Sequence, residues 1–476
     1  MSGIARGAAV AAALALVAGC TGDPAPPPAP APAVPPPTRL EQPFGLKWNS
    51  YRPIDRYAPA VGAYRGGGTF HDITWCAVEP APGTFRWTME DRAVDTALGQ
   101  GYELLLRIRI GSCWASGRPA AAAARTAPSH PPADLTAYRA FVRTLVGRYA
   151  RRGVHRYAIE NEVDTATHWG ADPRAYAAVA RAGAAAVREA DPRARVTDPG
   201  LASSGHGLAA AAALQDSGRQ DRAVALYRAY YARRVNDRLP PVRDAAGLRA
   251  ARAGTAGHRI LTAHETVLGL GRAKIFDSFQ LHYYDPWRQA GDVLAYLRAR
   301  LPANLPVEAW EAGSFWPGGS YDPARHAAET AQLATTLLAA GVRLVVYLPL
   351  VHTPGTIAPT ERWRGLYGTD GTARPASAVL DALRERTRGG TWHPVARAGL
   401  RGAAVDRGGT TALVLWSADG RTRPLRRPPG PAESTPLPGA ARPWTAGDVQ
   451  VGGTPVLLSL RAPLNAALTW LDQTAP

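Results

Sequence analysis

Short apolar segments alternate with longer amphipathic segments over most of this chain, and the alternation predicts its elements. Eight apolar segments are predicted as strands, namely 44–48, 69–74, 103–110, 155–159, 195–198, 276–283, 305–310 and 342–348. Four intervening segments carry apolar residues close to a helical period, namely 134–151, 172–190, 322–340 and 376–386. Strands that alternate with helices are typical of parallel strands joined by crossovers, and eight such units predict an α/β fold of the (β/α)8 TIM-barrel type.

A doubly wound open sheet is the alternative arrangement for the same elements. It requires a glycine-rich phosphate-binding loop directly after an early strand. The triplet Gly66-Gly67-Gly68 comes before a strand instead. The barrel is therefore preferred.

The barrel is expected to span residues 40–390, with one long connection and a different domain after it. The connection, about 206–260, is rich in alanine and arginine and is predicted to be helical. It is either a lid or wall of a binding cleft, or a packing insertion. Residues 391–476 hold short β-type runs separated by Gly/Pro-rich turns, which predicts a small all-β sandwich.

The N-terminus has the features of an export signal. Arg6 precedes an apolar run that ends in Val17-Ala18-Gly19-Cys20, which predicts a signal peptide over residues 1–19. The residues before Cys20 resemble the lipobox of bacterial lipoproteins, and the resemblance implies that Cys20 is lipidated. Residues 20–39 then form a Pro-rich linker. We expect an exported protein on the outer face of the bacterial cell membrane, or a secreted one if the anchor is absent.

The composition of the 476 residues limits the partners of this protein. The net charge is +17, but the basic residues are almost all arginine, with Lys47 and Lys274 as exceptions. No dense basic run, zinc spacing or aromatic-basic motif accompanies the charge, so we expect no nucleic-acid partner. The charge favours an oligo- or polysaccharide partner that is acidic. The oligomeric state is not predicted.

Two further cysteines are expected to pair. Cys76 and Cys113 each lie just past a predicted strand, and the two strands are consecutive. Neighbouring strands would bring the thiols together in an exported chain, where disulfides persist. The alternative is two buried free thiols; their spacing fits no zinc site.

Carboxylates gather at two strand ends. The stretch YAIENEVD ends a strand in Glu160, Asn161, Glu162 and Asp164, and a later strand ends in Trp310-Glu311 followed by Ala312-Gly313. In a barrel, active groups come from the C-terminal ends of strands, and the fourth and seventh strands lie nearly opposite across the mouth. We select Glu162 and Glu311 over their respective rivals Glu160 and Glu308, because Asn161 can bind a sugar hydroxyl beside Glu162 and Glu308 lies inside the strand.

Two converging carboxylates suit glycoside hydrolysis. One protonates the leaving oxygen, and the other attacks the anomeric carbon or activates water. This chemistry requires no cofactor and no metal.

Five stretches carry a resemblance to a known family: DITWCAVEPAPGTFRW, the Asn-Glu segment 158–196, FDSFQLHYY, LPVEAWEAGSFW and GLYGTDGTARPASAVLDAL. They resemble clan A glycoside hydrolases, most of all family 39, the β-xylosidase and α-L-iduronidase family. The resemblance covers about 40–390. It implies a retaining enzyme in which Glu162 is the acid/base and Glu311 the nucleophile, with Asn161 on a sugar hydroxyl. His282 and Tyr284 are expected to orient Glu311 or to contact the sugar.

The chain departs from the family pattern at one position. Family members often have an arginine where this chain has Phe70. Arg107 or Arg109, which alternation puts on one face of the third strand, is expected to substitute. Trp316, just past Glu311, is the preferred sugar-stacking platform.

Two other functions remain open from the sequence. One is a non-catalytic carbohydrate-binding lipoprotein on a glycosidase-like barrel, although binding alone would not require both glutamates. The other is a transglycosylase, which uses the same chemistry with a sugar as acceptor.

Overall fold

The computed structural model describes residues 39–52, 54–118, 127–233, 239–314, 321–351, 365–397 and 399–474. The predicted signal peptide, Cys20 and the linker up to residue 38 lie outside this part of the chain. Among the helices that the structure describes, none is long and apolar enough to cross a membrane.

The described residues contain eight parallel strands whose order follows the sequence. β3 to β6 form one hydrogen-bonded sheet and β7, β8, β9 and β2 form another. Parallel bridges between Thr197 and Ser278 and between Leu201 and Leu281 join β6 to β7. The α/β class and the barrel are confirmed. The strands are β2 (Phe44–Leu46), β3 (Gly68–Thr74), β4 (Glu103–Arg109), β5 (Arg156–Ile159), β6 (Arg195–Thr197), β7 (Phe279–Tyr283), β8 (Val307–Ala312) and β9 (Val345–Tyr347).

Glycines bring β2 against β3 on the other side of the barrel. A Cβ added to Gly45 would lie 2.0 Å from the carbonyl oxygen of Gly68, and one added to Gly67 would lie 1.9 Å from that of Phe44. No larger residue fits at either position, so the glycine triplet at the start of β3 serves a close backbone approach.

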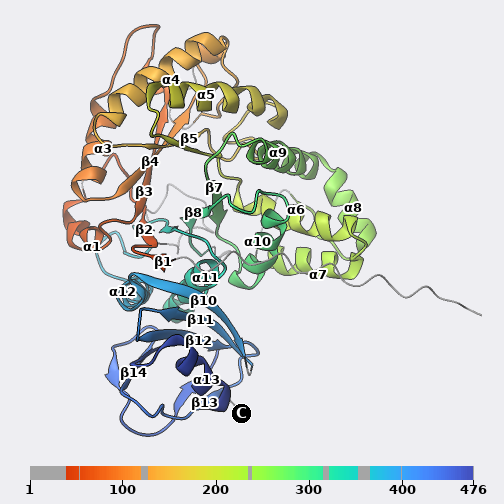
Figure 1. The fold of residues 1–476 in the computed structure, drawn as a ribbon. Helices are drawn as coiled ribbons and strands as arrows, with labels where there is room; N and C mark the ends of the chain where they lie inside the picture. The colour runs from red at the N-terminus through yellow and green to blue at the C-terminus, as the bar shows by residue number, and fades with distance from the viewer. Residues whose placement is uncertain are drawn as a thin grey trace, which may run out of the picture. The chain divides into compact units, whose positions relative to one another are not determined.

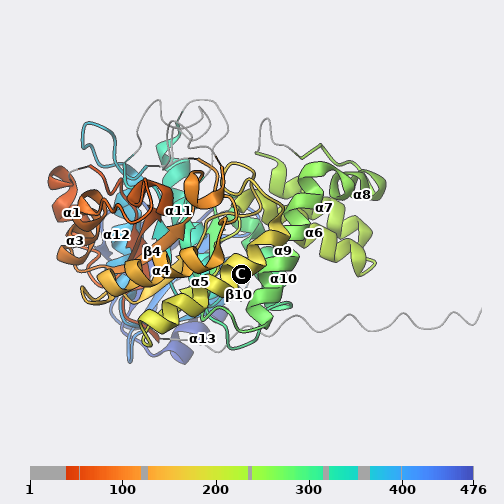
Figure 2. The same ribbon diagram turned by 90° about the horizontal axis from the view of Figure 1, so that it is seen from above.

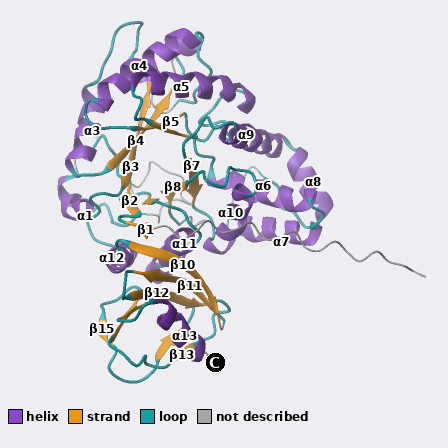
Figure 3. Cartoon of the chain, in the orientation of Figure 1, coloured by secondary structure: helices purple, strands orange, loops and turns teal. Residues whose placement is uncertain are grey.

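Helices surround the strands (Figures 1 and 3). Aspartate N-caps begin α4 and α11: Asp134 accepts a hydrogen bond from the backbone of Thr136 at 2.7 Å, and Asp322 accepts two at 3.0 Å. The helices of the barrel other than the long connection are α1 (Ala58–Gly62), α2 (Trp75–Val78), α3 (Thr88–Gly99), α4 (Leu135–Ala150), α5 (Tyr176–Ala190), α10 (Ala290–Arg298), α11 (Pro323–Ala339) and α12 (Pro375–Thr387).

The long connection between β6 and β7 is helical, as predicted, and starts earlier and ends later than 206–260. It contains α6 (Ser203–Asp216), α7 (Gln220–Tyr231), α8 (Ala245–Ala253) and α9 (Thr255–Arg272). These helices share an apolar cluster of their own that includes Leu208, Leu226 and Leu248. Figure 2 shows α6, α7 and α8 together at one side of the barrel.

The C-terminal region is built on an antiparallel sheet of the order β1-β10-β11-β12-β17-β14-β15. A two-stranded ribbon, β13–β16, and a helix that the sequence did not predict, α13 (Leu464–Thr474), pack with it. The strands are β1 (Arg39–Leu40), β10 (Gly390–Arg397), β11 (Leu400–Asp406), β12 (Thr411–Ser417), β13 (Arg423–Leu425), β14 (Ala432–Pro436), β15 (Arg442–Pro443), β16 (Val449–Val451) and β17 (Val456–Leu460).

The two remaining cysteines are joined. Cys76 in α2 and Cys113 after β4 form a disulfide. It ties together the segments that follow two neighbouring strands, β3 and β4.

Candidate active site

An unusual backbone separates the carboxylates at the end of β5. Glu160 has a φ of 68° and Glu162 a φ of 42°, which is the left-handed region that residues other than glycine seldom adopt. Glu160 is buried, and its Oε1 accepts a hydrogen bond from the backbone of Ile110 at 2.7 Å. Asp164 accepts one from the backbone of Ala202 at 3.0 Å. Glu162 lines a cavity, so of these three carboxylates it is the one placed for chemistry there.

In β8, a β-bulge between the two glutamates gives them different surroundings. Glu308 is paired with Gln280 and Glu311 with His282, so three residues of β8 span two of β7. Glu308 accepts hydrogen bonds from Arg156, at 3.0 Å to each oxygen, and from the indole of Trp310 at 3.0 Å. Glu311 lines the same cavity as Glu162.

The two glutamates approach each other in this cavity, which has a volume of about 380 Å³. An oxygen of Glu162, an oxygen of Glu311 and a ring nitrogen of His282 all lie within 4.8 Å of one another. The cavity is lined by Lys47, Phe70, Asp72, Arg107, Asn161, Glu162, Thr165, His168, Ala202, Ser203, Ser204, Tyr284, Glu311 and Leu348.

His282 is fully buried between the two glutamates. Its Nδ1 lies 2.9 Å from Glu162 Oε1 and donates to that carboxylate. Its Nε2 lies 3.2 Å from Arg107 Nη2 and 3.3 Å from Gln280 Oε1. A Cβ added to Gly200 would lie 2.2 Å from His282 Nε2, so glycine is required where the chain passes this ring.

Arg107 and Tyr284 hold Glu311. Arg107 donates to Glu311 Oε1 at 2.5 Å, and the hydroxyl of Tyr284 donates to Oε2 at 2.6 Å. The guanidinium carbon of Arg107 lies 3.8 Å from the centre of the Phe70 ring. Of the two arginines proposed from the sequence, Arg107 reaches the glutamate, whereas Arg109 donates to the carbonyl of Ala127 at 3.3 Å.

These neighbours keep Glu311 ionised. Burial by itself would raise the pKa of Glu311, but His282, Arg107 and the hydrogen bond from Tyr284 outweigh burial and lower that pKa well below its usual value. A carboxylate that stays charged in a buried site can act as a nucleophile.

Asn161 and His168 flank Glu162. Asn161 Oδ1 is buried and has no hydrogen-bond partner among the described residues, so an acceptor is available at the cavity wall. His168 Nδ1 lies 3.2 Å from Glu162 Oε2. Burial lowers the pKa of His168, which favours the neutral ring. Trp316, the predicted platform, lies outside the described residues.

Among the lining residues that were not singled out from the sequence, three are ionisable: Lys47, Asp72 and His168. Lys47 donates to Ser50 Oγ at 2.9 Å and to the carbonyl of Phe70 at 2.6 Å, and burial lowers its pKa to about 8. The sequence could have pointed to Lys47, because it is one of only two lysines in a chain that otherwise uses arginine, and it stands at the end of the first predicted strand.

Glu162, His282 and Glu311 are close enough in geometry to hold a cation. The positive charges around these three residues disfavour a bound cation. The guanidinium of Arg107 already contacts Glu311 and His282, and Lys47 lies on the same wall. Two positive charges beside three ligand atoms disfavour a divalent ion.

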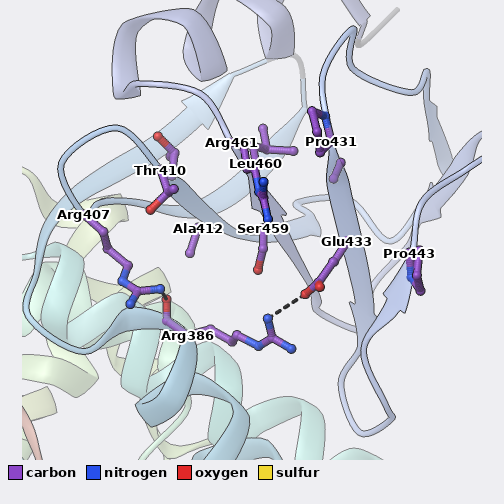
Figure 4. Close-up of a pocket in the computed structure, with 12 residues that line it drawn as sticks. Arg386, Arg407, Thr410, Ala412, Pro431, Glu433, Pro443, Ser459, Leu460 and Arg461 are labelled. Atoms are coloured by element: carbon purple, nitrogen blue, oxygen red, sulfur yellow. Dashed lines mark hydrogen bonds and ion pairs between the residues drawn. The ribbon is translucent and has the colours of Figure 1, made fainter.

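A separate cavity, of about 340 Å³, lies among α12, β12, β14 and β17. Figure 4 shows Arg386 directed at Glu433, to which it donates at 2.6 Å. Arg407 donates to the carbonyl of Arg386 at 3.4 Å. None of the site residues predicted from the sequence lines this cavity.

Solved structures similar to this chain are glycoside hydrolases. A family 39 glycoside hydrolase from the gut symbiont Bacteroides cellulosilyticus WH2 has a TM-score of 0.61 at 14% identity, over 88% of this chain and 81% of that one. A family 39 β-xylosidase from Caulobacter crescentus has a TM-score of 0.54 at 16% identity, over 89% and 97%. A family 39 enzyme from Xanthomonas axonopodis pv. citri has a TM-score of 0.52 at 16% identity, over 91% and 96%.

No protein-family model matches the sequence, and no curated protein matches it either. At these identities the likeness concerns the fold. The resemblance found in the sequence is confirmed at that level: the chain has the fold of family 39 and related clan A glycoside hydrolases.

Proposed function

We propose that this protein is a retaining glycoside hydrolase that acts on an extracellular or cell-envelope glycan. The observation that carries the proposal is the approach of Glu162 and Glu311 to within 4.8 Å, oxygen to oxygen, in one cavity. Retaining enzymes hold their carboxyl groups about 5–5.5 Å apart, whereas inverting enzymes leave about 6.5–9.5 Å for a water. The separation supports direct attack by a carboxylate.

The roles follow from the contacts of each glutamate. Glu311, kept ionised by Arg107 and Tyr284, attacks the anomeric carbon while Glu162 gives its proton to the leaving oxygen. The carbon–oxygen bond to the leaving group breaks, and an ester to Glu311 forms. Glu162 then takes a proton from water, which attacks the same carbon and releases Glu311.

The neighbours of the glutamates assist both steps. The Nδ1 proton of His282 fixes Glu162 Oε1, so proton transfer is assigned to Oε2, which lies 3.2 Å from His168 Nδ1 on the cavity wall. The free acceptor of Asn161 suits a hydroxyl of the sugar whose carbon reacts.

A panel of 2-deoxy-2-fluoro glycosides with good leaving groups tests the proposal. Such compounds form the ester quickly and release it slowly, so intact mass followed by peptide mapping should show one sugar on Glu311. Glu162→Gln should lower kcat/KM on substrates with poor leaving groups by about 10²–10⁴-fold. The matched control is Glu308→Gln, which changes the glutamate of β8 that lies outside the cavity.

The outcomes separate the possible functions. Labelling of Glu308, or of no carboxylate, contradicts the assignment of the nucleophile. Sugar binding without turnover by the wild type would instead indicate a binding protein. A product with sugar in place of water as acceptor would indicate transglycosylation.

A further inference from the structure

The cavity that holds the glutamates is the first cavity, and another cavity of about 370 Å³, the second cavity, adjoins it. The second cavity is distinct from the one among α12, β12, β14 and β17. The first and second cavities share Lys47, Phe70, Asp72 and Leu348 as a common wall. The rest of the second cavity is formed by the segments that follow β2 and β9, with His71 of β3. These other lining residues are Trp48, Asn49, Ser50, Tyr51, His71, Pro349 and Val351.

The position of the second cavity relative to Glu162 decides which part of a glycan it could hold. A leaving group must lie within hydrogen-bond reach of the proton donor Glu162. Thr165, His168 and Ser204 line the first cavity on that side, and they follow β5 and β6. The second cavity contains neither glutamate and is formed mainly by the segments that follow β2 and β9, the strands that lie across the eight-stranded barrel from β5 and β6. It therefore extends the side that holds the glycone.

The lining of the second cavity combines aromatic rings with polar groups. The ring of Tyr51 is 38% exposed, and Trp48 is only 5% exposed while its indole nitrogen has no hydrogen-bond acceptor among the described residues. The side chain of Asp72 is 36% exposed, and its Oδ1 contacts Arg107 at 3.8 Å without accepting a hydrogen bond. Aromatic surface with a few placed polar groups is typical of a small-molecule site, and here its chemistry fits the faces and hydroxyls of a sugar.

Behind this surface, buried pairs fix the residues in place. His71 Nε2 lies 2.6 Å from Glu90 Oε2, and the hydroxyl of Tyr51 donates to the same oxygen at 3.3 Å. The ring of Tyr51 also packs edge-on against His71, with 5.1 Å between centroids. An exposed aromatic ring held in one orientation offers a preformed contact to a ligand.

We propose that the second cavity is a sugar subsite on the glycone side. The enzyme then recognises at least two consecutive sugar units before the scissile bond and cleaves within an oligosaccharide. This inference rests on the proposed glycosidase function. Binding energy gained in the second subsite, remote from the reacting carbon, is available to accelerate formation of the ester.

Matched inactivators test the subsite. Each pair consists of the 2,4-dinitrophenyl 2-deoxy-2-fluoro glycosides of a monosaccharide and of its disaccharide: xylose and xylobiose, glucose and cellobiose, mannose and mannobiose, and a uronic acid and its disaccharide as the acidic pair. The rate of labelling of Glu311, followed by intact mass, should be roughly tenfold or more higher for the disaccharide of the productive pair. Tyr51→Ala should reduce this ratio, while Phe85→Ala, which removes an aromatic ring of similar exposure outside both cavities, should preserve it.

Each outcome decides the matter. A ratio near one in the wild type, or a ratio that Tyr51→Ala leaves unchanged, overturns the subsite while glycosidase function stands. Absence of labelling by both members of every pair counts against the glycosidase function and removes the basis for the subsite. Circular dichroism of Tyr51→Ala identical to that of the wild type ensures that a lowered ratio reports binding.

Discussion

At the scale of single residues, the proposed nucleophile Glu311 depends on one buried arginine. Arg107 contacts Glu311, Gln280 and His282 at once, and it does so with the two ends of one planar group. A lysine at this position keeps the charge but offers a single point of contact. The planar guanidinium of Arg107 therefore fixes the orientation of Glu311 as well as its ionisation.

We predict that Arg107→Lys lowers kcat/KM by about 10²-fold or more, since positioning errors at a reacting group cost about that much. Steady-state kinetics and the rate of labelling of Glu311 measure it. Arg109→Lys is the matched control, because Arg109 lies on the same face of β4 and contacts a backbone carbonyl. Equal losses in both variants would contradict the role of Arg107.

Glu160 supplies a second prediction at this scale. Burial raises the pKa of Glu160 from 4.5 to about 7. Because its pKa in the folded protein is above that in the unfolded chain, the folded protein binds more protons between these two values. The contribution of Glu160 to the free energy of unfolding is therefore present at low pH and falls as the pH rises through this window.

Glu160→Gln removes this titration while keeping the size of the side chain. Relative to the wild type, the free energy of unfolding of the variant should rise by about 1–3 kcal/mol between about pH 5 and about pH 8. Urea denaturation at both pH values measures the change. Glu189→Gln, at an exposed glutamate on α5, should show the same difference from the wild type at both pH values. If the free energy of unfolding of Glu160→Gln differed from that of the wild type by the same amount at both pH values, the raised pKa of Glu160 would be contradicted.

At the scale of elements, apolar periodicity in the sequence predicted the strands and several helices. Features that depend on the register between strands were not predicted. All eight strands and the helices α4, α5, α11 and α12 follow from apolar spacing, with bounds that differ by a few residues, whereas α1, α2, α3 and α10 were not predicted. The bulge in β8 and the left-handed residues after β5 depend on how each strand meets its neighbours. Alternation likewise put Arg107 and Arg109 on one face, and only their different depths in the barrel separate them.

The disulfide is an element-scale constraint with a measurable effect. Cys76 and Cys113 are 37 residues apart, and the bond between them restricts the unfolded chain over α3 and β4. The double variant Cys76→Ala/Cys113→Ala should have a free energy of unfolding lower by about 2–4 kcal/mol. Denaturation of the wild type with and without a thiol reductant should reproduce that loss. An unchanged midpoint would show that the bond does not constrain the unfolded chain.

At the scale of the whole molecule, the C-terminal sheet shares its core with the barrel. In β12, Ala412, Val414 and Trp416 belong to the main apolar cluster, whereas the alternate residues Leu413 and Leu415 belong to a smaller one. Trp416 packs against Trp287, with 5.2 Å between ring centroids. The uninterrupted apolar run that the sequence shows here is therefore a strand covered on both faces.

The location of the molecule is a prediction that belongs to residues 1–38, outside the described part of the chain. If Cys20 carries lipid, a bacterial host that makes the protein should retain it in the membrane fraction until detergent is added. Cys20→Ser should move it to the soluble fraction and abolish incorporation of radiolabelled palmitate. Two acyl chains are needed for a stable anchor, so loss of the lipidated cysteine should release the protein fully.

The kcat/KM of the released protein should equal that of the wild type in detergent, because the glutamate cavity is built from strand ends of the barrel. A Cys20→Ser variant that stays in the membrane pellet would contradict the lipid anchor. It would point instead to retention of the protein by its basic surface, and washing the pellet with high salt would then release it.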